Sequence, residues 1–378
     1  MAVKSSGPLS FSEIQAELGG SNPISLSEYY KNGSIINNDI HDPNSIPNSG
    51  NAITVNDFYS CARRQFASWS GGNATHTSGN FRTHVFTSST GFSRNRAGIG
   101  SGRDKLHYIV IGGGGGGGTV TGGGGGAGDF MSGSFNTGNR TSFYMRIGGG
   151  GNAGASSGPS TRILSNGPSG RGGQSRIQAS SSNGSHRFVT GIGGGGGMCF
   201  REPHYFQNSS HSYFANGGSG GGGCGTIDSH RGFQIGAGAG HHGGRGAERE
   251  ETLCGGGGGG AGGAGIGGGG TVPGRDPGVN ASRGGVGINI TGFPGANGFR
   301  AGGGTGGGLR RTATRTPFSG GGGNGGAGPG IRSDFCGGGS GAGNKGAGGG
   351  GGGYNGNGVG GLGGRGGSGI IAVKYQFR

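Results

Sequence analysis

The chain has 378 residues, of which 114 are glycine, and only 28% of its residues are hydrophobic. This is too little apolar side chain for an ordinary core, while the lack of a strict Gly-X-Y repeat and the presence of only 12 prolines argue against collagen. The net charge of +15 indicates a basic surface, which suits an anionic partner such as nucleic acid, lipopolysaccharide or acidic polysaccharide.

The first 62 residues differ from the rest and indicate a small, partly helical module. A helix is predicted over 11–18, with Ser10 or Ser12 as its N-cap and Gly19 as its stop. A module of this size is expected to bury little and to need a partner chain, so we predict that it serves attachment or oligomerisation. The side chains expected to make that contact, three of them on one face of the helix, are Phe11, Ile14, Leu18, Tyr29 and Tyr30.

Residues 63–111 are predicted to form a β base, because apolar and polar residues alternate in several short stretches. Residues 52–58 fit either a strand or the start of a short helix. Strands are expected at 65–69, 81–86, 106–111, 142–147, 186–189, 232–235, 286–290 and 369–377. The last of these should pair near 106–111.

Long glycine runs follow several of these strands and dominate residues 112–368. Runs of five or more glycines stand at 112–118, 122–126, 193–197, 255–260 and 348–353. Such runs become ordered only if neighbouring backbones hydrogen-bond to one another, because glycine has no side chain to bury. In an extended three-fold helix the N–H and C=O groups point outward and can form these bonds. We therefore predict a bundle of polyglycine II helices.

The predicted fold class is mainly β and irregular, with short strands clamping this bundle. The predicted organisation is an N-terminal module at 1–62, the β base at 63–111, the glycine-rich bundle with variable loops at 112–368, and a closing strand at 369–378.

No signal peptide or membrane-spanning run is visible, so synthesis in a cytoplasm is expected. The five cysteines are widely spaced and include no C-x-x-C pair, which indicates buried free thiols, with a disulfide among them as the alternative. They are Cys61, Cys199, Cys224, Cys254 and Cys336.

Nothing in the sequence predicts catalysis, a metal or a cofactor. At this glycine content about ten G-x-G-x-x-G matches are expected by chance, so the nucleotide fingerprint carries no information. Residues 217–221 match a nucleophile elbow but lie inside a glycine tract. His241 and His242, with Glu248, Glu250 and Glu251 nearby, lack the H-E-x-x-H spacing of a zinc site.

The sequence GPLSFSEIQAELGG at 7–20 resembles the N-terminal motif of structural proteins from marine and cyanobacterial tailed phages. The remainder resembles the glycine-rich domain of phage tail-fibre and adhesin proteins, in which a strand such as 108–111 precedes the first glycine run and one such as 368–373 ends the domain. The resemblance implies a layered polyglycine bundle whose variable loops contact a host receptor. This chain departs from the pattern by carrying both modules.

Two segments between the runs are candidates for receptor recognition. One is rich in aromatic residues and the other has three arginines within six positions, side chains that suit sugar rings and acidic groups of a cell surface. The alternatives are an aromatic cap on the bundle and a solvated basic loop. The candidate residues are Arg201, His204, Tyr205, Phe206, His211 and Tyr213 in the first segment, and Arg310, Arg311, Arg315 and Phe318 in the second.

The leading hypothesis is a virion tail-fibre or tail-tip adhesin: other virion proteins would bind residues 1–62, and a host glycan or outer-membrane protein would bind the loops. The alternative is a capsid- or neck-attached decoration protein with a structural role. An RGG-type RNA-binding protein is disfavoured because the three Arg-Gly-Gly sites are far apart, so no nucleic-acid partner is expected. Assembly as a homotrimer, or as a monomer mounted on a trimeric fibre, remains open.

Overall fold

The computed structural model describes residues 3–31, 33, 35–36, 40–42, 44–63, 66–98, 104–119, 121–154, 169–179, 187–198, 216–223, 238–246, 255–267, 283–308, 337–353 and 361–377. These residues are mainly β and irregular, which confirms the predicted fold class. The helices are α1 (Phe11–Leu18), η1 (Leu26–Tyr29) and η2 (Val55–Phe58). The strands are β1 (Ile40–His41), β2 (Ala62–Arg63), β3 (Ser68–Gly71), β4 (Ala74–Ser78), β5 (Phe81–Phe86), β6 (Thr90–Arg96), β7 (Lys105–Ile111), β8 (Phe130–Asn136), β9 (Ser142–Arg146), β10 (Ser175–Ala179), β11 (Arg187–Gly191), β12 (Ile288–Ile290), β13 (Gly298–Arg300) and β14 (Ile370–Gln376).

The N-terminal module is built around α1, which begins with a reciprocal cap. The Ser10 hydroxyl accepts a hydrogen bond from the backbone N–H of Glu13 at 3.3 Å, and the Glu13 carboxylate accepts one from the N–H of Ser10 at 2.8 Å. Lys4 donates to the same carboxylate at 2.8 Å and, together with the capping bonds, lowers the pKa of Glu13 to about 2. Of the two predicted N-caps, Ser10 is the one used, and Gly19 ends the helix as predicted.

This module has a hydrophobic core of its own, contrary to the expectation that it buries little. The buried members of the core are Val3, Ile14, Leu18, Tyr29, Ile36, Ile40, Ile46, Phe58 and Cys61. Residues 52–58, which fitted a strand or a helix start, contain the single turn of η2. Cys61 is a free, buried thiol, as predicted, and burial raises its pKa to about 12; the other four cysteines lie outside the described residues.

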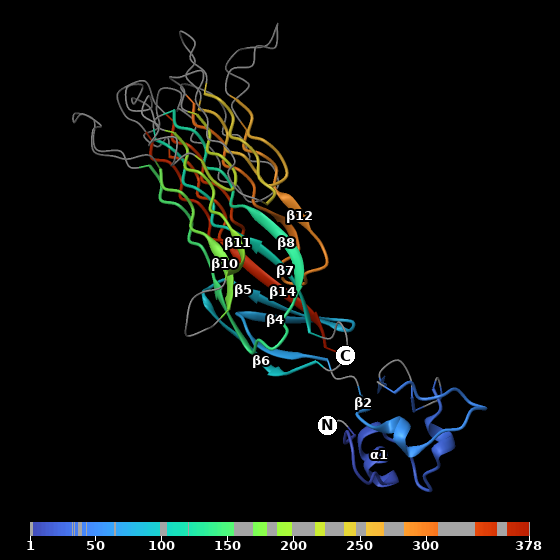
Figure 1. Ribbon diagram of the computed structural model, residues 1–378. Coiled ribbons are helices and arrows are strands. Elements are labelled where there is room, and N and C mark those ends of the chain that lie inside the picture. The colour runs from blue at the N-terminus through green and yellow to red at the C-terminus, as the bar shows by residue number, and fades with distance from the viewer. Residues whose placement is uncertain are drawn as a thin grey trace.

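Two five-stranded antiparallel sheets form the β base and continue beyond it (Figure 1). One sheet has the order β4-β5-β14-β7-β8, and the other has the order β11-β10-β9-β6-β3. The last strand, β14, pairs with β7 in antiparallel register, with Ile370 opposite Ile111 and Lys374 opposite His107. This confirms the predicted pairing of the closing strand.

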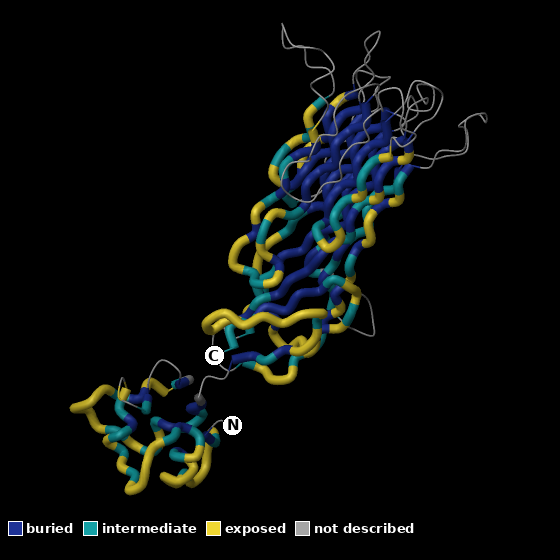
Figure 2. Tube along the Cα trace, turned by 180° about the vertical axis from the view of Figure 1, so that it is seen from behind, coloured by how far each residue is buried: buried dark blue, intermediate teal, exposed yellow. Residues whose placement is uncertain are grey.

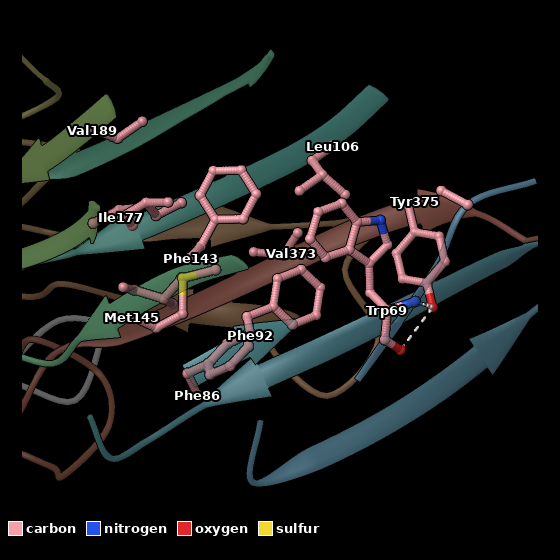
Figure 3. Close-up of a cluster of buried hydrophobic side chains, with 13 residues drawn as sticks. Trp69, Phe86, Phe92, Leu106, Phe143, Met145, Ile177, Val189, Val373 and Tyr375 are labelled. Carbon is pink, nitrogen blue, oxygen red and sulfur yellow. Dashed lines mark hydrogen bonds between the residues drawn. The ribbon is translucent and has the colours of Figure 1, made fainter. Parts of the chain in front are cut away.

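The faces of the two sheets that meet enclose the main hydrophobic core (Figure 3). Val373 and Tyr375 come from β14, while Trp69, Phe92 and Phe143 come from the second sheet. The buried backbone N–H of Trp69 donates to the Tyr375 hydroxyl at 3.2 Å. The opposite face of the first sheet packs against residues around the β12–β13 hairpin, including Ile290, Ala296 and Ala301.

Strands lead directly into glycine runs, so that the sheets and the bundle are continuous. The runs at 112–118, 148–154 and 192–198 follow β7, β9 and β11, and the run at 361–369 precedes β14. Figure 1 shows the bundle extending from one end of the sheets, with the N-terminal module beyond the other end. This arrangement fits the predicted strand clamp.

Candidate functional site

The scaffold of the candidate site is the glycine bundle, and its first run, 112–118, donates hydrogen bonds with a period of three residues. Gly113 and Gly116 donate to Gly173 and Gly170, which lie on one neighbouring segment. Gly114 and Gly117 donate to a second neighbouring segment, and Gly115 and Gly118 donate to a third neighbouring segment. The remaining donor pairs are Gly114 and Gly117 to Gly367 and Gly364, and Gly115 and Gly118 to Gly126 and Gly123.

The carbonyl groups of the same run accept hydrogen bonds from three further segments, again with a period of three residues. Gly113 and Gly116 accept from Gly194 and Gly197. The other acceptor pairs are Gly114 and Gly117 from Gly151 and Gly154, and Gly115 and Gly118 from Gly349 and Gly352. Along residues 113–118, the residue numbers of the partners decrease in the three segments that accept hydrogen bonds, so these segments run antiparallel to the run. The residue numbers increase in the three segments that donate, so these segments run parallel to it. A three-fold helix with six neighbours is the geometry expected for polyglycine II.

The second run, 122–129, is surrounded in the same way. It hydrogen-bonds to segments at 112–118, 192–198, 219–222, 256–259, 304–307 and 346–352. Both runs are buried (Figure 2), and each buried amide that finds a backbone partner avoids the penalty of an unsatisfied polar group. Backbone hydrogen bonding therefore replaces side-chain packing in this part of the protein.

Only glycine permits this spacing in the run at 112–118. A Cβ atom added at Gly114 would overlap the carbonyl of Ala347, and one added at Gly117 would overlap the carbonyl of Gly350. Both carbonyls belong to a neighbouring backbone rather than to a side chain that could move aside. The composition of the runs is therefore required by the closeness of the helices.

The end of the bundle away from the sheets is where many of the intervening segments join. Here we call it the distal end; it is marked by residues 117–123, where the first run turns back toward the sheets. Five segments between described runs join the bundle at this end on both sides, as the hydrogen bonds of the flanking runs indicate. They are 155–168, 247–254, 268–282, 309–336 and 354–360.

The predicted receptor-binding residues all lie outside the described residues, in segments 199–215 and 309–336. Their flanks are described. Met198, which precedes the aromatic segment, accepts a hydrogen bond from Gly123 at the distal end, whereas Gly217 and Gly218, after that segment, lie beside the run at 193–195 near the sheets. The basic segment is flanked at the distal end on both sides.

The predicted attachment residues occupy two different environments. Ile14, Leu18 and Tyr29 are fully buried in the core of the N-terminal module, so they stabilise that module and are not on its surface. Tyr30 is half-buried and donates to the carbonyl of Asn51 at 3.0 Å. Phe11 is 42% exposed because it stands at the first residue of α1, at the edge of the apolar face formed by Ile14 and Leu18.

Asp129 is a buried carboxyl group at the base of the bundle that the sequence prediction missed. Its Oδ2 accepts a hydrogen bond from the N–H of Gly238 at 3.2 Å, and its Oδ1 is buried without a hydrogen-bond partner. Burial raises the pKa of this carboxyl to about 6, although backbone amides partly oppose the shift. One feature of the sequence could have drawn attention to this residue: Asp129 is the only acidic residue between Asp104 and Glu202.

This environment predicts a stability that changes with pH. Because the pKa of Asp129 is about 6 in the folded protein and near 3.8 in the unfolded chain, the free energy of unfolding should fall as pH rises from about 4 to about 6. The free energy of unfolding should be lower above pH 6 than below pH 4 by up to about 3 kcal/mol from this one group. Asp129→Asn should abolish this part of the pH dependence. Thermal unfolding midpoints of both proteins measured across pH 4–7 would check it, and parallel curves would contradict it.

Among the described residues, no three His, Cys, Asp or Glu side chains gather into a group that could hold a metal ion. The described helices include none with the length and apolar character needed to cross a bilayer. The chain matches no known protein-family model and no curated protein.

Proposed function

We propose that the protein is a virion structural protein, a tail-fibre or tail-tip adhesin that presents the segments at the distal end to a host-cell surface. The observation that carries the proposal is that five intervening segments begin and end at one end of a continuously hydrogen-bonded bundle. Variable segments held by a rigid scaffold are the usual location of binding residues. The role proposed is therefore binding rather than catalysis.

The N-terminal module is the proposed attachment to other virion proteins. It has its own core, and it lies beyond the sheets on the side away from the bundle (Figure 1). The resemblance of residues 7–20 to a motif of phage structural proteins supports this role. The exposed side chain of Phe11 is the strongest candidate contact.

The proposed receptor is a host glycan or outer-membrane protein, and the proposed assembly is a homotrimer or a monomer on a trimeric fibre. Antibodies against residues 198–216 and 309–318, used for gold labelling of purified particles, would test the location. Label at the tail or fibre tip supports the adhesin. Label over the head or neck would instead favour a decoration protein, and unlabelled particles would argue against exposed loops on a virion.

A direct binding test uses the full chain. Purified protein added to the host cells of the labelled particles should compete with those particles for adsorption. A variant carrying Arg310→Gln, Arg311→Gln and Arg315→Gln should compete at least tenfold less well. A matched triple variant, Lys105→Gln, Arg140→Gln and Arg365→Gln, loses the same charge from exposed positions that flank none of the distal segments, and it should compete like the parent. Equal loss in both variants would contradict recognition by the basic segment.

A further inference from the structure

The outer edge of β4 is an interaction surface that the fold leaves open. β4 lies at one edge of the sheet β4-β5-β14-β7-β8, and all five of its residues are exposed (Figure 2). Among the described residues, only those of β5 pair with it. An edge strand presents a row of backbone N–H and C=O groups with which a strand of another chain can pair.

The other edge strands of the two sheets have features that hinder such pairing. β8 begins with a bridge between Phe130 and Ala239, and the register of β3 shifts between Ser68 and Trp69. The pairing of β10 with the edge strand β11 also contains a shift, and β11 carries Arg187. In contrast, β4 contains no Lys, Arg, Asp, Glu or Pro, and its register with β5 is regular. It is therefore the edge best suited to receive another strand.

The hydrogen bonds on the two sides of β5 show which backbone groups of β4 face outward. The Phe377 N–H donates to the carbonyl of Asn80 at 3.0 Å, and the Asn73 N–H donates to the carbonyl of Val85 at 2.8 Å. Because hydrogen-bonded pairs alternate along antiparallel strands, even-numbered residues of this segment bond toward β14 and odd-numbered ones bond toward β4. The residues of β4 that lie opposite the odd-numbered ones, and so bond to β5, are Ala74, His76 and Ser78.

Thr75 and Thr77 therefore present their backbone N–H and C=O groups to the open edge. Neither residue makes a further backbone hydrogen bond within the described part of the chain. The strand is fixed at both ends: the Asn73 side chain accepts from the N–H of Thr87 at 2.8 Å, and the turn after the strand has Gly79 at φ 56°. Because the strand is already held in place, little conformational entropy is lost when a second strand pairs with it.

The sequence of β4, Ala-Thr-His-Thr-Ser, is nearly the same in both directions about His76. When two copies pair antiparallel with His76 opposite His76 of the second copy, Thr75 lies opposite Thr77 of the second copy. Each of the two Thr–Thr pairs then exchanges two N–H···O=C bonds, so this register uses both outward-facing residues of each chain. Thr–Thr pairs stabilise antiparallel strands, and this register opposes no Lys, Arg, Asp or Glu. β4 is therefore a complement to itself.

The size of the contact predicts a weak pair. A strand of this length spans about 17 Å and a sheet layer is about 10 Å thick, so the contact is much smaller than the roughly 1,200 Å² of a stable interface. The net charge of +15 on each chain also opposes association, although salt screens it. Pairing should therefore be detected only at high protein concentration.

We propose that two copies of the protein associate through antiparallel pairing of β4 with β4, so that their two five-stranded sheets become one continuous sheet. The proposal does not rest on the virion role proposed above. It concerns the β base, whereas the attachment and receptor surfaces proposed above are the N-terminal module and the distal end.

Sedimentation velocity of the full-length protein in 150 mM salt, from about 1 to about 300 µM, would test the proposal. The mass should double as the concentration rises, whether the protein is a single chain or a trimer at the lowest concentration. Thr77→Pro removes an outward N–H but no bond to β5, so it should weaken this association at least tenfold. Thr77→Val keeps the N–H and should associate like the parent. A mass that does not double, or equal association of the two variants, would overturn the proposal.

Disulfide capture tests the register and decides the question even if Thr77→Pro does not fold. His76→Cys brings the two substituted Cα atoms to about 4.5 Å, within the range of a disulfide. Ala74→Cys is the control on the same face, because its two copies would be about 14 Å apart. Under mild oxidation, His76→Cys should link two chains at least tenfold faster than Ala74→Cys or the parent, whose five cysteines set the background. Equal or absent linking by the two variants would contradict β4 pairing.

Discussion

Replacing Gly115 with alanine should lower the thermal unfolding midpoint by about 4 °C, the shift expected for a loss of about 3 kcal/mol in a chain of this size. Gly115 lies in the centre of the first run, and an added Cβ would overlap the carbonyl of Gly195. That carbonyl accepts a hydrogen bond from Gly126 at 2.8 Å, so the neighbour cannot move away without weakening a bond to a third run. A single methyl group should therefore disturb three helices of the bundle.

Gly149→Ala is the matched control for this experiment. Gly149 belongs to a neighbouring run but is exposed, and an added Cβ there would meet no atom within 4 Å. Alanine also reduces the conformational entropy of the unfolded chain, so this variant should be unchanged or more stable by up to about 1 kcal/mol. Equal destabilisation of both variants, measured by calorimetry or circular dichroism, would contradict the argument that close backbone approach determines the glycine content.

The architecture was predictable from the sequence because its two main signals are local. An apolar run such as residues 370–373 fits a strand that is buried on both faces, and β14 is indeed central in its sheet. The repeated change from strand to glycine run indicated the bundle. The strands that were found close to their predicted positions are β3, β5, β7, β9, β11, β12 and β14. The strand predicted at 232–235 lies outside the described residues.

Three of the missed strands, β4, β6 and β8, lack such a pattern for physical reasons. All five residues of β4 are exposed at the edge of a sheet, so nothing selects apolar residues there. β6 has only Phe92 fully buried among its seven residues. β8, at the other edge, has no buried residue. β6 and β8 are defined by pairing with strands that are distant in sequence, which local periodicity does not reveal, whereas β4 pairs only with the adjacent strand β5.

The candidate sites were less predictable than the fold. Sequence reasoning could mark segments of unusual composition, but the partners of a side chain depend on register. Asp129 and Gly238 are 109 positions apart and meet only because Ala239 pairs with Phe130, the residue after Asp129. Similarly, the apolar spacing of α1 could not distinguish a docking face from the interior of the module, and the structure places Ile14 and Leu18 in the interior.

Deleting residues 369–378 should abolish soluble, protease-resistant protein. The deletion removes β14, which makes six cross-strand pairs with β5 and five with β7 and so joins the two halves of its sheet. Its side chains also fill two cores at once: Ile371, Val373 and Tyr375 face the second sheet, and Ile370 and Ala372 face the β12–β13 side. Loss of the strand would expose both cores and leave the backbone groups of β5 and β7 unpaired.

Point variants in the same strand separate loss of packing from loss of the whole strand. Ile371→Ala truncates a fully buried side chain and should cost about 2–5 kcal/mol, while Ile371→Val should cost about 0.5–1.5 kcal/mol. Lys374→Gln removes a half-exposed amine that donates to the carbonyl of Gly292 at 2.8 Å, and it should change stability by less than about 1 kcal/mol. Limited proteolysis and thermal unfolding of the soluble variants would rank them.

If the protein without residues 369–378 stayed soluble and resistant to protease, the bundle would not need β14 to close its base. The lateral hydrogen bonds of the glycine runs would then be sufficient to hold the fold.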